Sequence, residues 1–388
     1  MRISTNYMYE NSRRTMQTSV SNLVKTQEIM ASQQRINHLS DDPVDAGRLL
    51  NTQGLIQSQE QFLGNLETGT TFSNLYDGAF DDMISVLKRA KSLLVGAANS
   101  ATSTAQTREA SRTEIVSLAS QLTVIGNLQY SDRFLFAGYA DDTAPFVDIQ
   151  VTANAGAGNT GTGAVTSQAV SDTALVTGDA YRISFTGANT YDVLNTTTGV
   201  PVSSGNTYTP GGNIVFDGLM LQVSNAPAAG DTFDISTVPA GTYVGDSGVV
   251  QLEMERDIFQ QVNYTGDRAF LGSGNPDGVN LFDIFEQANV ALRNNDQAAI
   301  QTLLTSFDKA VEQTSGMQAE VGARANKFDK ATDRLEDIKL ELNTILTKVR
   351  DVDVTDAVTN LNKQENAYQA VLAATAKVIQ PNLLDFLS

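Results

Sequence analysis

The stretch "RINHLSDDPVDAGRLL", residues 35–50, holds the only histidine of the chain beside two aspartates and a proline. A helix start explains this pattern. Asp42 can accept hydrogen bonds from free backbone N–H groups, and proline suits the first helical position because it lacks an N–H. Asp45 adds negative charge in the first turn, where the helix dipole favours it. We therefore predict a hinge between two helices, formed by Ser40, Asp41, Asp42 and Pro43.

The alternative for this stretch is a metal site at His38, Asp41 and Asp42. The chain has one histidine and no cysteine, so no second strong nitrogen or sulfur ligand exists to complete a tight site. The same composition excludes disulfides, cysteine nucleophiles and a convincing histidine-based triad. We expect no metal, no cofactor and no catalytic residue.

Both ends of the chain carry narrow apolar stripes on otherwise polar helices. Residues 6–37 place Met16, Leu23 and Met30 seven apart, and residues 354–379 have a similar pattern. Asp353 or Thr355 is expected to cap the second of these helices, and Asp353 is included in the predicted hinge. The predicted assembly interface consists of Met16, Val20, Leu23, Met30, Leu361, Tyr368, Leu372, Ile379, Leu383, Leu384 and Phe386.

A single terminal helix gains little when it folds alone. About eight apolar side chains contribute on the order of 12–24 kcal/mol when fully buried, whereas ordering about 32 residues costs roughly 32–64 kcal/mol, offset in part by helical hydrogen bonds. We therefore expect both ends to be largely disordered or frayed in the isolated chain. They should become ordered when several subunits surround them.

Between the ends, composition separates a helical part from a β-rich part. Apolar residues at helical spacing predict helices over 44–98, about 104–129, 281–292 and about 297–350, with a coiled-coil-like seam in the last. Residues 141–250 contain no Lys, no Glu, one Arg and 15 of the 29 glycines, and they have strand and turn patterns. The predicted strands are "TALVT", "AYRISF", "TYDVL", "NIVFDG", "LMLQVS" and "DTFDIS".

The predicted fold class is mainly α, a long antiparallel helical bundle made by the N- and C-terminal parts, with an inserted β domain. We expect three regions: terminal polymerisation helices at 1–42 and 354–388, a helical core with a β-hairpin at 43–140 and 250–353, and a variable β-rich outer domain at 141–249. Such a chain suits a tubular polymer or ring of identical subunits.

Charge and hydropathy exclude several classes of partner. The formal charge of −18 opposes binding to nucleic acid or to an anionic membrane surface. No apolar run is long enough to span a bilayer. The first residues lack the continuous apolar core of a signal peptide, so we expect any export to proceed without a cleaved signal.

Two short motifs resemble enzyme signatures without their structural context. "GAGNTG", residues 156–161, matches a dinucleotide-binding pattern but is followed by turn and strand residues, so we predict a flexible turn. "DVDVT", residues 351–355, matches a phosphatase pattern whose nucleophile needs the end of a parallel strand. Here it lies between two predicted helices.

Several stretches together resemble the bacterial flagellins and their hook-associated relatives. They are "MRISTNYMYENSRRTMQ" at 1–17, "RINHLSDDPVDA" at 35–46, "YSDRFLFAGYADDTAPF" at 130–146 and the tail from Asp351 to Ser388. Residues 216–235 are similar to a module of hook-associated proteins. The opening and the "NLLDFLS" ending resemble the junction-forming branch more than the filament-forming flagellins, which often end in Leu-Leu-Arg.

The resemblance implies a non-enzymatic structural adaptor of the extracellular flagellum that joins the hook to the filament. It implies self-assembly, contact with the first hook-associated protein and with flagellin, export through the flagellum's own type III channel, and a chaperone that binds the C-terminal stripe. Two alternatives stay open: a flagellin subunit of the filament, and a secreted adhesin that binds through the central β domain. An enzymatic function is a third alternative, and its only support would be the two short motifs described above.

Overall fold

The computed structural model describes residues 5–99 and 104–384, which form two compact units. We call the first unit the helical arm; it holds the described residues up to Asn65 and those from Lys330 onward. The second, the central unit, runs from Leu66 to Asp329. Two long helices, α2 (Pro43–Ala98) and α6 (Gln297–Arg350), contribute to both units.

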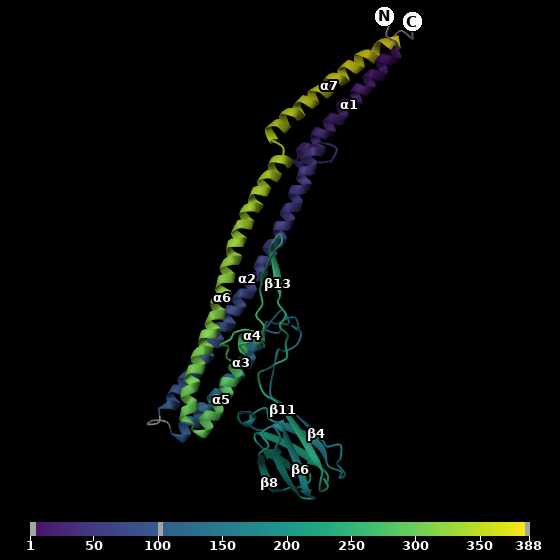
Figure 1. Ribbon diagram of the computed structural model, residues 1–388. Coiled ribbons are helices and arrows are strands. Elements are labelled where there is room, and N and C mark those ends of the chain that lie inside the picture. The colour runs from purple at the N-terminus through teal and green to yellow at the C-terminus, as the bar shows by residue number, and fades with distance from the viewer. Residues whose placement is uncertain (1–4, 100–103, 385–388) are drawn as a thin grey trace. The chain divides into compact units, whose positions relative to one another are not determined.

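The arm contains two pairs of helices, each made by one helix from the N-terminal part of the chain and one from the C-terminal part. Helices α1 (Thr5–Ser32) and α7 (Val354–Leu384) lie side by side and run in opposite directions (Figure 1). The first part of α2 and the last part of α6 form the second pair. An ion pair of 2.9 Å joins Glu60 and Lys339 across it. The predicted helical boundaries agree with the structure within three residues, except at the ends of α1 and α7; α7 continues to Leu384, five residues beyond the predicted end at residue 379.

Helix α1 ends at Ser32, five residues before the predicted end at residue 37. Gln33 has a φ of 55°, a left-handed conformation that cannot continue an α-helix. Gln34 then forms an isolated antiparallel β-bridge with Asp351. The prediction was wrong here because apolar periodicity does not register a single residue that leaves the helical region.

The helical part of the central unit is held by aromatic rings. Helices α3 (Ala105–Gly126), α4 (Gly266–Phe270) and α5 (Leu281–Asn294) pack with α2 and α6 around one apolar cluster. Within it, the ring of Phe136 lies 5.3 Å from Tyr76 and 5.1 Å from Phe270, centroid to centroid. Three short two-stranded pairs complete this part: β1 (Gln129–Tyr130) with β2 (Arg133–Phe134), β3 (Phe146–Val147) with β12 (Thr242–Tyr243), and β13 (Gln251–Glu255) with β14 (Ile258–Gln261).

The β-rich part of the central unit contains two antiparallel sheets that share a second apolar core. One sheet has the order β4-β11-β6-β7-β8 and the other β5-β10-β9. Along β6, Tyr181, Ile183 and Phe185 are buried and Arg182 is exposed, as the predicted alternation requires. The strands are β4 (Gln150–Ala155), β5 (Ala164–Val170), β6 (Tyr181–Gly187), β7 (Thr190–Asn195), β8 (Pro201–Thr207), β9 (Asn213–Phe216), β10 (Leu219–Ser224) and β11 (Thr232–Val238).

One predicted strand was wrong. The segment "TALVT" does not form a strand; Thr173–Leu175 make a single turn of 3-10 helix, closed by a bond of 3.2 Å from Leu175 N to Asp172 O. Five apolar or β-branched residues are too few to distinguish a strand from such a turn. The predicted class, helical at both ends with a central β-rich region, is confirmed. Within the described residues, none of the helices has the length and apolar character needed to cross a bilayer.

Candidate assembly site

The two terminal helices meet along a seam with heptad spacing. In each helix the least exposed residues are separated by four and three positions in turn, which is the pattern of a coiled coil. The seam of α1 consists of Ser12, Met16, Ser19, Leu23, Thr26 and Met30. The seam of α7 consists of Ala357, Leu361, Gln364, Tyr368, Val371 and Thr375.

The structure brings together five of the predicted interface residues. Met16, Leu23 and Met30 on α1, and Leu361 and Tyr368 on α7, lie half-buried in the seam. The other predictions have different positions. Val20 and Leu372 lie beside the seam, each with 37% of its surface exposed. Ile379, Leu383 and Leu384 belong to α7 with side chains outside the described part, and Phe386 lies outside the described residues.

Sequence reasoning missed the other members of the seam. Ala357 and Val371 fall at the heptad positions that the stripe leaves open, so their spacing was a usable signal. Ser12, Ser19, Thr26, Gln364 and Thr375 gave no such signal because polar residues are invisible to an apolar pattern.

This composition makes the seam a weak one. Polar or small residues alternate with larger apolar ones on both helices, and the hydroxyl of Ser19 is buried without a hydrogen-bond partner. A buried, unpaired hydroxyl costs about 1–3 kcal/mol. Meanwhile Tyr7, Tyr9 and Val24 of α1 stay largely exposed. The pair therefore leaves apolar surface free for further contacts.

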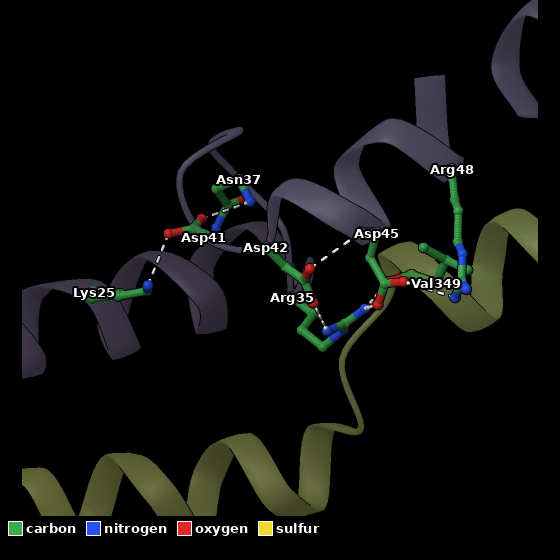
Figure 2. Close-up of polar contacts among 8 residues, drawn as sticks. All are labelled: Lys25, Arg35, Asn37, Asp41, Asp42, Asp45, Arg48 and Val349. Atoms are coloured by element: carbon green, nitrogen blue, oxygen red, sulfur yellow. Dashed lines mark hydrogen bonds and ion pairs between the residues drawn. The ribbon is translucent and has the colours of Figure 1, made fainter. Parts of the chain in front are cut away.

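Where α1 ends, the chain forms a loop organised by the carboxylate of Asp41. Its Oδ1 pairs with Lys25 Nζ at 2.8 Å, and its Oδ2 accepts hydrogen bonds from the backbone N–H groups of His38 (2.9 Å) and Asn37 (3.2 Å) (Figure 2). The bond from Lys25, followed by that from His38, lowers the pKa of Asp41 to about 2. The carboxylate thus links the end of α1 to the loop that follows it.

Arg35 connects this loop to both long helices of the arm. Its guanidinium contacts Asp42 (3.3 Å) and Asp45 (2.5 Å) at the start of α2, and donates to the backbone oxygen of Val349 (3.0 Å) near the end of α6 (Figure 2). Its backbone N–H donates to Arg350 O at 2.7 Å. Arg35 therefore joins the α1–α2 and α6–α7 connections, together with the β-bridge between Gln34 and Asp351.

Aspartates begin both helices that leave the junction. The Asp42 carboxylate accepts from Asp45 N at 3.1 Å, and α2 starts at Pro43. Asp353 accepts from Thr355 N at 2.8 Å and from Asp356 N at 3.3 Å, and α7 starts at Val354. These backbone bonds are the main cause that lowers the pKa of each capping carboxyl.

The remaining predicted hinge residue, Ser40, is exposed in the turn before α2. The geometry shows two adjacent helix ends and two adjacent helix starts. A hinge motion at these residues stays a prediction.

The structure gives ordinary explanations for the residues that resembled chemical sites. His38 Nε2 lies 3.0 Å from Glu28 Oε1 and its side chain is exposed. In residues 5–99 and 104–384 there is no group of three or more His, Asp or Glu side chains placed to hold a metal ion.

The two enzyme-like motifs lack the context that their chemistry needs. The glycine-rich turn at 156–161 is held by the Asp231 carboxylate, which accepts from Thr160 N at 2.8 Å, and it leads into strand β5. Asp351 and Asp353 lie between two helices, with no parallel strand before them.

The two chain ends form paired antiparallel helices, and a β-rich segment is inserted between the two helical parts of the chain. Two family models match this arrangement: the bacterial flagellin N-terminal helical region over residues 3–141 and the bacterial flagellin C-terminal helical region over residues 304–387. Together they cover more than half of the chain. The chain belongs to the bacterial flagellin family. A third model, the D2-like domain of flagellar hook-associated protein 1, matches residues 153–237.

Individual relatives come from both branches of this family. The chain is 30% identical to flagellar hook-associated protein 3 of Escherichia coli over 152 residues, which covers 38% of this chain and 46% of that protein. It is 23% identical to a flagellin of Clostridium tyrobutyricum over 98% of this chain and 99% of that one. A putative flagellar hook-associated protein from Vibrio parahaemolyticus has a similar fold, with a TM-score of 0.51, 17% identity, and coverage of 80% of this chain and all of that one.

Proposed function

We propose that this chain is a hook–filament junction protein of the third hook-associated type, an adaptor between the flagellar hook and the flagellin filament. The observation that carries the proposal is the combination of a flagellin-type arm with a central domain of hook-associated type. The model that matches the central part is one of a hook-associated protein and not of a filament subunit. The 30% identity to hook-associated protein 3 over 152 residues supports the same branch.

The mechanism we propose is mechanical. Copies assemble as a ring or short tube through their terminal helices, and the seam residues Met16, Leu23, Met30, Leu361 and Tyr368 align α1 with α7 within each copy. Apolar residues beside the seam, such as Val20 and Leu372, then contact other copies. The junction around Arg35 transmits force between the terminal pair and the rest of the arm.

The same proposal names the neighbours and the route. The first hook-associated protein lies on the hook side and flagellin on the distal side. The chain leaves the cell through the flagellar type III channel without a cleaved signal, and an export chaperone binds the C-terminal stripe until then. A free apolar stripe on α7, exposed at Val354, Val358 and Leu372, supports the need for such a chaperone.

The test is a strain of the source bacterium that lacks this chain. We expect complete hooks, short or absent filaments, and flagellin lost to the medium. Full-length chain should restore filaments, whereas a chain without residues 5–32 should be exported and should not restore them.

Two results would contradict this function. Normal filaments in the deletion strain would exclude a junction role. Filaments built mainly from this chain, measured by its abundance in sheared flagella, would instead identify a flagellin subunit.

A further inference from the structure

The central unit contains a cavity of about 820 Å³. Helices α3 and α5 form two of its walls, and residues of the segments 148–149, 170–176 and 239–243 close it. Val124 of α3 lies in the wall and is 67% exposed, so the cavity opens to solvent. The volume lies within the range of about 300–1,000 Å³ that is typical of small-molecule sites.

Much of the wall of this cavity is apolar. Aliphatic side chains come from Val116 of α3, Val170 of β5 and Ile149. The rings of Phe282 and Phe285 on α5 line it as well, and both residues are buried. Walls of this kind contact the apolar body of a ligand, whereas a few polar groups fix its orientation.

The charged residues of the wall are all acidic. They are Asp148, Asp283 and Glu286, and no Lys, Arg or His is among the described residues that line the cavity. Glu286 is half-buried, and within residues 5–99 and 104–384 its carboxylate has neither a hydrogen bond nor an ion pair. A ligand that satisfies this carboxylate has to carry a positive charge or a hydrogen-bond donor.

The neighbours of Glu286 do not neutralise it. Burial raises the pKa of its carboxyl, and the negative charges of Asp283 and Asp179 raise it further. Arg112 on α3 is the basic residue that reaches α5, and its guanidinium is bound to Glu109 at 2.6 Å. A carboxylate that loses hydration without gaining a partner costs stability, and such groups are concentrated at functional sites.

The nature of the wall indicates which kind of cation fits. A divalent metal ion such as Ca²⁺ requires six to eight oxygen ligands around it. Here the carboxylates lie at one side of a wall made largely of valine, isoleucine and phenylalanine. This combination suits an organic cation, in which one end is charged and the rest is apolar.

We propose that this cavity binds a small organic cation, an amine whose ammonium group pairs with Glu286 and Asp283 and whose apolar body contacts the valine and phenylalanine side chains. The site lies outside the arm and its seam. The proposal goes beyond the proposed function and does not depend on it, since the purified chain alone can be tested.

Titration of the full-length chain with tryptamine tests the proposal. The chain has no tryptophan, so the fluorescence anisotropy of the indole ring reports the ligand alone. Tryptophol and indole-3-acetate have the same ring with a neutral and a negative end. In about 150 mM salt, which screens general attraction to the acidic chain, we expect saturable binding of tryptamine and at least about tenfold weaker binding of the other two.

A matched pair of variants locates the site. Glu286→Gln should weaken the binding of tryptamine about tenfold, because it removes the charge and keeps the shape. Glu312→Gln makes the same change at an exposed residue of α6 that does not line this cavity, and it should leave the affinity unchanged. Asp283→Asn, at an exposed position of the wall, should weaken binding severalfold and serves as a second variant if Glu286→Gln alters the near-ultraviolet circular dichroism.

Acid provides an independent measurement on the same site. Because the pKa of Glu286 lies above its usual 4.5, this carboxyl takes up a proton while the ammonium group stays charged. Binding should therefore be strong near pH 7 and weaken as the pH falls toward about 5, and Glu286→Gln should reduce this dependence.

Three results would overturn the inference: no saturation up to about 10 mM tryptamine, equal affinities for tryptamine and tryptophol, or equal effects of Glu286→Gln and Glu312→Gln. None of them bears on a junction role, which the deletion strain tests separately.

Discussion

The terminal seam of the arm and the aromatic core of the central unit are both contacts between distant parts of the chain, yet they are built from different side chains. The core contains rings such as Tyr76, Phe136 and Phe270, each almost fully buried. The seam alternates half-buried Met and Leu with Ser, Thr and Gln. The apolar area buried in the core is large enough to stabilise it within one molecule. The seam, in contrast, leaves much of its apolar surface in contact with water.

The difference in burial between the core and the seam corresponds to two different roles in an assembly. A subunit of a polymer needs a part that is folded before assembly, and a part whose folding is completed by assembly. Strong burial in the arm of a single chain would leave less to gain from contact with neighbours. The comparison therefore predicts that mutations in the two regions affect different measurements.

Substitution of a core ring should have the largest effect on stability. Phe136→Ala removes a fully buried ring that contacts Tyr76, Phe80 and Phe270, and we expect it to lower the free energy of unfolding by about 3–5 kcal/mol. Urea unfolding followed by near-ultraviolet circular dichroism measures this loss. Val124→Ala, at a residue with 67% exposure on α3, is the control and should change it little. A similar stability for both variants would remove the contrast between core and seam.

The sequence predicted the helices of both regions well because their length gives many repeats of the apolar pattern. It failed where one residue decides the geometry, as at Gln33, whose left-handed conformation ends α1 early. It also failed at segment 173–177, which is too short for periodicity to distinguish strand from turn.

Within the candidate site, the apolar half of the seam was predicted and the polar half was not. Ser19 and Gln364 face the partner helix only because spacing places them there, and composition gives no indication of it. The role of Arg35 was also missed, since its contact with Val349 joins residues more than 300 positions apart. Such contacts depend on tertiary structure and have no local signal.

A substitution in the seam should change the stability of the chain little and its incorporation into flagella strongly, the opposite of the core substitution. Leu23→Ala removes a half-buried side chain, so we expect the unfolding transition of the central unit to change by less than about 1 kcal/mol. Incorporation into flagella should nevertheless fall severalfold, because every copy in the assembly loses the same contact. Quantitative blotting of sheared flagella measures this. Gln27→Ala changes an exposed polar residue of the same helix and is the matched control. If Leu23→Ala assembled normally, the seam would not be required for assembly.

The smallest expected effect concerns the loop between α1 and α2. Because Lys25 and two backbone N–H groups hold the pKa of Asp41 at about 2, below its usual value of 3.8, folding favours the ionised carboxylate. A carboxyl with a lowered pKa stabilises the folded state fully above about pH 4, and this contribution is lost as the pH falls toward 2. The effect is modest because Lys25 is largely exposed and its ion pair is screened by water.

We expect the helical signal of the arm to fall between about pH 4 and pH 2 in the unmodified chain. Asp41→Asn should lower this signal already at pH 6 and should weaken its dependence on pH. Circular dichroism at 222 nm measures both. Glu28→Gln, which removes the negative charge from the neighbouring contact with His38 and keeps the loop bonds, should behave as the unmodified chain. Identical acid profiles for Asp41→Asn and the unmodified chain would show that the Asp41 carboxylate does not stabilise the arm.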